Sequence, residues 1–163
     1  MIIRLKNKDK LIVNDFIFKC CIGKKGLNKH KIEGDNCTPK GTFRIGDLYY
    51  RSDRVKKPIT NLKCIKIKKK MGWCNNSLSR YYNKLVIIKK NFKAEKLYRK
   101  DYKYNYFIDL KYNSKKIKPF KGSAIFIHLT NNYKPTAGCL ALEEKDFLIL
   151  LKIINKNSKI SIN

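Results

Sequence analysis

The sequence of 163 residues predicts one mainly β domain, spanning 1–163, with one substantial helix near its C-terminus. Two observations lead to this prediction. Short apolar runs separated by polar turns recur along most of the chain, which is typical of antiparallel strands. The segment 143–155 instead repeats its apolar residues at helical spacing. No repeat or linker divides the chain, and its length is sufficient for a single domain to bury a core.

The strands are predicted from short β-rich segments taken in chain order. Apolar runs within 2–22 predict the first strands, with Asn14 and Asp15 forming a turn. Further segments with strand character are 42–46, 104–112, 125–128 and 159–162. The basic segment 56–70, which Pro58 interrupts, is expected to be a long surface loop.

The helix is predicted from the segment Glu143–Asn155. Phe147, Leu150, Leu151 and Ile154 recur at a spacing that places them on one buried face. Acidic residues occupy its first turn, where they complement the helix dipole.

The net charge of +27 is the most extreme property of the composition. A basic chain invites a nucleic-acid hypothesis, and binding of that kind would weaken steeply with salt. However, lysine supplies most of the 39 basic residues, and the lysines are spread over nearly the whole chain. We therefore interpret the charge mainly as a solvated surface that also favours anionic ligands, and expect no nucleic-acid partner.

The six cysteines have no paired C-x-x-C spacing and no histidine cluster near them, so a metal site is poorly supported. We expect free thiols, which favours a reducing compartment. The first ten residues lack the apolar stretch of a secretory signal, and no apolar run is long enough to span a bilayer. These features by themselves indicate no export.

The segment from His128 to Cys139 is the strongest candidate for a catalytic centre. The apolar run 123–127 predicts a strand that delivers His128 at its end, and Cys139 follows Gly138 after a loop of ten residues. An imidazole beside a thiol can form a base–nucleophile pair. Gly138 allows the backbone to turn closely beside the nucleophile, so the amides of Gly138 and Cys139 are candidates for an oxyanion hole. Spacing alone slightly favours the alternative, in which Cys139 is a buried thiol and His128 a hydrogen-bonded residue at the end of a strand, with no chemistry between them.

Three motifs in order resemble the L,D-transpeptidase (YkuD-type) catalytic domain. Thr136, Gly138 and Cys139 match three positions of its Ser/Thr-His-Gly-Cys signature, with His128 as the strand-end histidine. The stretch 38–45, TPKGTFRI, resembles the family's T-P-x-G-x-F-x-I element. The segment 72–83 resembles the G-W-C-D-D…Y-N element of a subgroup.

The resemblance implies a β-sandwich or barrel-like fold and cysteine acyl transfer on peptidoglycan stem peptides, without a cofactor. It implies Cys139 as nucleophile, His128 as general base and the Gly138 amide as oxyanion donor. The candidates for substrate binding are Thr136, Trp73, Tyr82 and Arg44. For Trp73 and Tyr82, packing in the core is an equal alternative. The resemblance also implies a location in the periplasm or cell envelope, while the lack of a visible secretory signal keeps the cytoplasm as the alternative. We expect a monomer without a transmembrane segment.

The sequence also departs from the family pattern. Ala137 stands where the family has a second histidine, and Asn75 and Asn76 replace an acidic pair. Transfer to an amine acceptor and hydrolysis by water, as in an L,D-carboxypeptidase, use the same site and remain alternatives.

Overall fold

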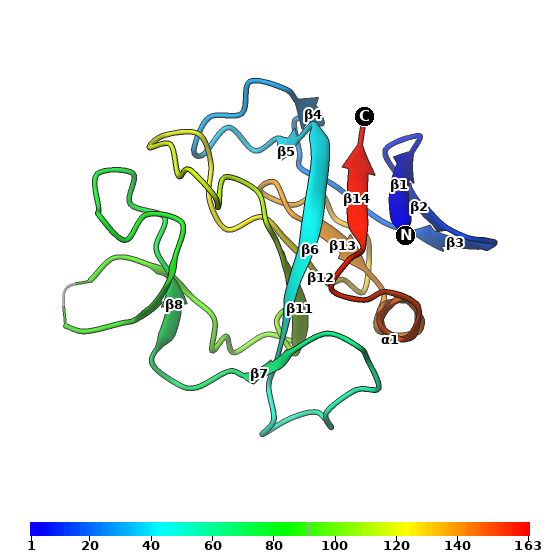
Figure 1. Ribbon diagram of the computed structural model, residues 1–163. Helices are drawn as coiled ribbons and strands as arrows, with labels where there is room; N and C mark the ends of the chain where they lie inside the picture. Colours follow the sequence, from blue (N-terminus) through cyan, green and yellow to red (C-terminus); the bar gives the residue numbers. More distant parts are fainter. Residues whose placement is uncertain (91) are drawn as a thin grey trace.

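The computed structural model describes residues 1–90 and 92–163, and in this part of the chain a nine-stranded mixed sheet forms most of the fold. Its strands lie in the order β13-β12-β11-β6-β14-β1-β2-β3, and β7 also pairs with β6. The strand bounds are β1 (Ile2–Lys6), β2 (Lys10–Val13), β3 (Phe16–Lys19), β6 (Gly41–Tyr50), β7 (Cys64–Lys66), β11 (Tyr106–Leu110), β12 (Phe126–Leu129), β13 (Leu140–Leu142) and β14 (Lys159–Ile162). Figure 1 shows the long β6 running through the middle of this sheet between β11 and β14.

The two ends of the sheet meet, so the sheet is nearly closed. Cys21, shortly after β3, donates its amide to the carbonyl of Ala141 in β13 at 3.0 Å. The amide of Ala141 donates to the carbonyl of Cys21, also at 3.0 Å. Closure pairs backbone groups that an open edge would leave exposed. The prediction of a mainly β, barrel-like fold with one helix is confirmed.

The helix α1 (Glu144–Ile153) covers the main core. Its side chains Phe147, Leu150 and Leu151 are fully buried, as the apolar spacing predicted. They pack with alternate residues of the strands, because inward-facing positions recur with a period of two. In β1 and β14 those residues are Ile3, Leu5, Ile160 and Ile162. The described residues contain no helix with the length and apolar character that a membrane crossing requires.

A second, aromatic core lies between the main sheet and a small three-stranded sheet. The small sheet consists of β8 (Met71–Trp73), β9 (Leu85–Ile87) and β10 (Glu95–Lys96). The rings of Tyr49 and Phe107 stack at 4.7 Å, and Phe126 lies 4.6 Å from Phe107 between ring centres. Phe126 of β12 is part of this core, so the core helps to hold the strand that carries His128.

Two further elements differ from or extend the expectations. The segment 56–70 is not only a surface loop, because β7 pairs with β6 in parallel, with Tyr49 opposite Ile65. A two-stranded ribbon of β4 (Leu27–Asn28) and β5 (Thr38–Pro39) lies at the N-terminal end of β6. The loop between β4 and β5 contributes to the site described below.

Candidate active site

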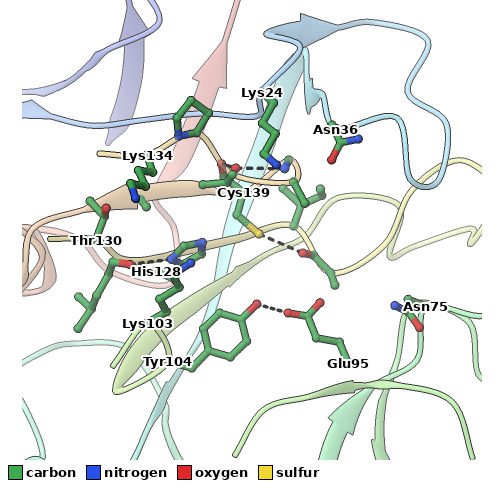
Figure 2. A pocket seen from close by; sticks show the side chains of 18 of the residues that line it. Lys24, Asn36, Asn75, Glu95, Lys103, Tyr104, His128, Thr130, Lys134 and Cys139 are labelled. Atoms are coloured by element: carbon green, nitrogen blue, oxygen red, sulfur yellow. Dashed lines mark hydrogen bonds between the residues drawn. The ribbon is translucent and has the colours of Figure 1, made fainter. Parts of the chain in front are cut away.

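His128 and Cys139 come from neighbouring strands. His128 lies in β12, whose four residues are all buried, and β12 pairs in parallel with β13 so that His128 is opposite Ala141. Cys139 immediately precedes β13. The register of the two strands places it on the same face of the sheet as His128. Figure 2 shows the sulfur of Cys139 and the imidazole of His128 turned toward one pocket. The sheet topology therefore brings together the two residues that the sequence singled out.

The pocket is a cavity of about 680 Å³ with a mainly cationic wall. His128, Cys139 and Thr136 all line it. Among the described residues, its charged lining side chains are Lys24, Lys31, Arg99, Lys103 and Lys134 as cations and Glu33 and Glu95 as carboxylates. The excess of cations favours an anionic ligand, because a cleft lined by one sign of charge concentrates ions of the other.

His128 is held as a neutral base. Its Nδ1 lies 2.9 Å from the carbonyl oxygen of Leu129, and a carbonyl can only accept, so Nδ1 carries the proton. The imidazole is 7% exposed, and burial lowers the pKa of His128 to about 4 although the bond to Leu129 opposes this shift. The ring of Tyr104 packs edge-on against it, 5.6 Å between centres. Nε2 is therefore unprotonated at neutral pH and can accept a proton.

Cys139 is held as a neutral thiol. Its Sγ donates to the carbonyl of Ala124 at 3.3 Å and accepts from the amide of Phe126 at 3.4 Å. Burial raises the pKa of the Cys139 thiol to about 12, and the negative charge of Glu95 adds to this shift. At neutral pH the pair is therefore thiol and imidazole rather than thiolate and imidazolium.

The turn before Cys139 is fixed by two threonines. The hydroxyl of Thr136 donates to the carbonyl of Cys139 at 2.6 Å and accepts from the amide of Gly138 at 3.1 Å. The buried hydroxyl of Thr38 donates to the carbonyl of Gly138 at 2.8 Å. Gly138 has a φ of +146°, and a Cβ there would lie 2.8 Å from the carbonyl oxygen of Cys37. Only glycine fits this position without moving the backbone.

The amides of this turn differ in their availability. The Gly138 amide is engaged with Thr136, so a role in an oxyanion hole would require that bond to be given up. The amide of Cys139 has no hydrogen-bond acceptor among residues 1–90 and 92–163. In the resting site, Cys139 therefore supplies the more available donor.

A comparison with protein families matched residues 3–162 to the L,D-transpeptidase catalytic domain, YkuD. The chain belongs to this family. The match covers nearly the whole sequence and includes all three motifs that carried the resemblance. A comparison with curated proteins gave no significant match.

Solved structures support the fold of this L,D-transpeptidase-family domain. It is similar to the crystal structure of the helical cell shape determining protein Pgp2 from Campylobacter jejuni, with a TM-score of 0.55 and 16% identity. A second structure of Pgp2, carrying one substitution, gives a TM-score of 0.55 and 17% identity. In both cases 99% of this chain aligns with 46% of the other, so the chain spans about half the length of Pgp2.

Of the four residues predicted to bind substrate, one lines the cavity of this L,D-transpeptidase-family domain. Thr136 is at the cavity wall, although its hydroxyl is occupied within the turn. Arg44 is an exposed residue of β6, and Trp73 and Tyr82 are 8% and 2% exposed. None of these three lines the cavity.

Trp73 and Tyr82 are buried next to the cavity and make hydrogen bonds that support its lining. The indole of Trp73 donates to Oδ1 of Asn83 at 2.9 Å, and the same oxygen accepts from the amide of Ala124 at 3.0 Å. The hydroxyl of Tyr82 donates to Glu33, which does line the cavity. The burial of Trp73 and Tyr82 agrees with the alternative that both residues pack in the core.

Sequence reasoning missed Glu95, Arg99 and Tyr104 at the floor of the cavity. Tyr104 donates its hydroxyl to Glu95, as Figure 2 shows, and the guanidinium of Arg99 lies 5.0 Å from the centre of the Tyr104 ring. Burial raises the pKa of Glu95, against the opposing effects of Tyr104 and Arg99. No motif marked these residues, since an isolated acid in a lysine-rich stretch carries no recognisable pattern. In the described residues, no group of three or more His, Cys, Asp or Glu side chains could hold a metal ion.

Proposed function

We propose that this domain is a cysteine acyltransferase that acts on peptidoglycan stem peptides and forms 3→3 cross-links through a thioester on Cys139. The observation that carries the proposal is the state of His128. Its Nδ1 proton is bonded to Leu129, which leaves Nε2 as an acceptor in the cavity that Cys139 also lines. Membership of the L,D-transpeptidase family supports the same chemistry.

In the first step, the sulfur of Cys139 attacks the carbonyl carbon of the third residue of a tetrapeptide donor. The thiol proton moves to Nε2 of His128 as the carbon–sulfur bond forms. Because thiol and imidazole are both neutral at rest, this transfer accompanies the attack rather than preceding it. The amide of Cys139 then donates to the developing oxyanion.

In the second step, the tetrahedral adduct collapses and the bond to the terminal D-amino acid breaks. The leaving nitrogen takes the proton from His128, and the peptide remains on Cys139 as a thioester. An amine from a second stem peptide attacks this thioester, and His128 accepts the amine proton. The carbon–sulfur bond then breaks to release the cross-linked peptide, and the proton passes from His128 back to the sulfur of Cys139. Attack by water instead releases a tripeptide, so hydrolysis is the alternative outcome of the same site.

The electrostatics of the cavity suit this substrate. Stem peptides carry free carboxylates, and the exposed lysines Lys24, Lys103 and Lys134 line the cavity around the reacting pair. These charges attract an anionic peptide over several ångströms and do so less at high salt.

The test is incubation of the purified domain with a muropeptide that carries a tetrapeptide stem, followed by mass spectrometry. We expect loss of the terminal residue and a cross-linked dimer. Tripeptide without dimer would identify the hydrolase. Cys139→Ala should abolish both products, whereas Cys64→Ala, which removes a free thiol outside the cavity, should leave them unchanged.

Two results would contradict the proposal. One is the absence of any product from a folded wild-type domain supplied with donor and acceptor stems. The other is unchanged product formation by Cys139→Ala, which would move the chemistry to another residue.

A further inference from the structure

Lys31 is a buried cation at the edge of the catalytic cavity. It is 4% exposed and lines the cavity, although it lies in the loop between β4 and β5, about a hundred residues from Cys139 along the chain. Its Nζ donates to Oδ1 of Asp35 at 2.6 Å and to the carbonyl of Ile32 at 3.3 Å. A buried ammonium without such partners would be strongly destabilising, so these bonds account for its charged state.

Asp35 is a rigid anchor for this ammonium. Besides Lys31, it accepts from the amides of Ile32 at 3.0 Å and Cys37 at 2.9 Å, and from the side chain of Asn28 at 3.3 Å. Burial alone would raise the pKa of Asp35, but the amide of Ile32 and the bond to Lys31 outweigh it, and the net shift is downward. Asp35 does not line the cavity, whereas Lys31 does. Lys31 therefore borders the cavity, while its counter-ion lies outside the lining.

Two glycines allow Lys31 to reach the catalytic turn. The aliphatic stem of Lys31 crosses Gly122, where an added Cβ would lie 3.0 to 3.2 Å from three carbons of the stem. Nζ lies 3.6 Å from the position that a Cβ would take on Gly138, the residue before the nucleophile. The charge is close enough to lower the pKa of Cys139, against the larger upward effect of burial. Two of the three Nζ protons are accounted for, and no acceptor for the third is found in the part of the chain that the structure describes.

We infer that Lys31 is a catalytic residue whose ammonium donates its third proton to the negative charge that develops beside Cys139. This inference rests on the proposed acyl transfer, because the charge is that of the tetrahedral oxyanion. Ala137 also lines the cavity, but its methyl group offers no donor at the position where the family has a histidine. Lys31 and the amide of Cys139 would then form the donor pair of the oxyanion site.

The test replaces Lys31 by methionine, which keeps the length of the buried stem and removes the charge. Loss of one oxyanion donor should lower kcat about 100-fold, while KM stays within about twofold. The matched control is Lys25→Met, which removes an exposed charge from the same region outside the cavity and should change neither constant. A rise in KM with kcat preserved would overturn the inference, since Lys31 would then bind the ground-state peptide only.

A second measurement does not depend on turnover. The rate of Cys139 alkylation by iodoacetamide at pH 8, followed on the Cys139 peptide by mass spectrometry, reports the fraction of thiolate. Lys31→Met should lower this rate several-fold, because the thiolate loses a nearby positive charge, and Lys25→Met should leave it unchanged. An unchanged rate in a folded Lys31→Met protein would overturn the inference even if the wild type processes muropeptides.

The two measurements separate failure of this inference from failure of the proposed function. A wild type that processes no stem peptide counts against the proposed function, while the alkylation rate still decides whether Lys31 acts on Cys139. If Lys31→Met does not fold, Lys31→Gln replaces it, because the amide can still donate to Asp35 while lacking the charge. The same loss of alkylation rate is expected from this variant, and its absence overturns the inference.

Discussion

The Nδ1 atom of His128 lies 2.9 Å from the carbonyl oxygen of Leu129, its neighbour in β12. Most side-chain acceptors that orient a histidine can be replaced by mutation, but this one is a backbone atom of the same strand. The tautomer of His128 is therefore fixed by the conformation of β12 itself. The aromatic core beneath this strand holds that conformation, and the edge-on ring of Tyr104 holds the imidazole.

The pH dependence of catalysis follows from the state of His128. Since burial lowers the pKa of His128 to about 4, the base stays unprotonated down to mildly acidic pH. We expect kcat/KM to be independent of pH between about 5 and 7 and to fall tenfold per unit well below pH 4. The measurement is a profile of kcat/KM with circular dichroism at each pH to verify folding. An acid limb near 6.5, the ordinary value for histidine, would contradict the buried neutral base.

The same shift makes folding stability depend on pH. The pKa of His128 is lower in the folded protein, so the unfolded chain binds the proton first as the pH falls below about 6.5. Stability is therefore fully present above that pH and is lost between about 6.5 and 4. We expect His128 to account for roughly 2 kcal/mol of lost unfolding free energy between pH 7 and 4.5. Urea titrations at both pH values measure it.

Two variants isolate this contribution. Between pH 7 and 4.5, the unfolding free energy of His128→Leu should fall by roughly 2 kcal/mol less than that of the wild type. His30→Leu removes the exposed histidine and should leave the wild-type dependence intact. Equal pH dependence in the wild type and in His128→Leu would show that the imidazole is not held neutral by burial.

The placement of His128 and Cys139 in one cavity was predictable from sequence because its signals are local. An apolar strand that carries His128 near its end and a glycine directly before Cys139 can be recognised without knowing the fold. The sequence left the partner of His128 open between Thr130 and a nearby backbone carbonyl, and the structure shows the carbonyl of Leu129. The sequence could not choose between them, because a backbone carbonyl carries no residue-specific signal. Lys31 and Glu95 also escaped prediction, since the sheet brings them to the cavity from distant segments.

The segment 72–83 was easy to recognise in the sequence, but the position of its aromatic side chains was not predictable. Trp73 and Tyr82 lie in a conspicuous segment, and both were candidates for the substrate cleft. Their exposure depends on how the small sheet packs on the main sheet, which the local pattern does not encode. The structure buries both side chains. Trp73 shares the acceptor Asn83 with the amide of Ala124, and Tyr82 donates to Glu33.

Gly138→Ala tests the close approach in the catalytic turn. The new Cβ would lie 2.8 Å from the carbonyl oxygen of Cys37, at a φ of +146°. We expect a loss of about 2 to 4 kcal/mol of unfolding free energy and a severe loss of turnover, because the displaced turn carries Cys139. Gly26→Ala is the matched control, since Gly26 also has a positive φ, +78°, but no atom within 4 Å of the added Cβ.

Gly26→Ala should cost only about 1 to 2 kcal/mol and leave turnover intact. Thermal or urea unfolding of both variants provides the comparison. An equal cost at both positions would mean that strain in φ alone, rather than the contact with Cys37, requires glycine at 138.

Asn83→Asp tests how the second core positions Cys139. The amide nitrogen of Asn83 donates to the carbonyls of Tyr112 at 3.0 Å and Asn113 at 2.9 Å, while its oxygen accepts from Trp73 and Ala124. An aspartate would turn a carboxylate oxygen toward two carbonyls and lose both donors. We expect a loss of about 2 to 4 kcal/mol at pH 7 and slower turnover, because the carbonyl of Ala124 accepts the thiol of Cys139.

The pH dependence of this variant identifies the cause. A carboxyl facing two carbonyls has a raised pKa in the folded state, so its destabilisation should shrink as the pH falls from 7 to 5 and the group regains a proton to donate. The control is Asn76→Asp, at an exposed side chain whose Oδ1 accepts from the amide of Leu78, a role that a carboxylate can fill. That variant should stay within about 0.5 kcal/mol of the wild type. Comparable losses at the two positions would contradict the view that the buried amide of Asn83, through Ala124, holds the resting thiol in place.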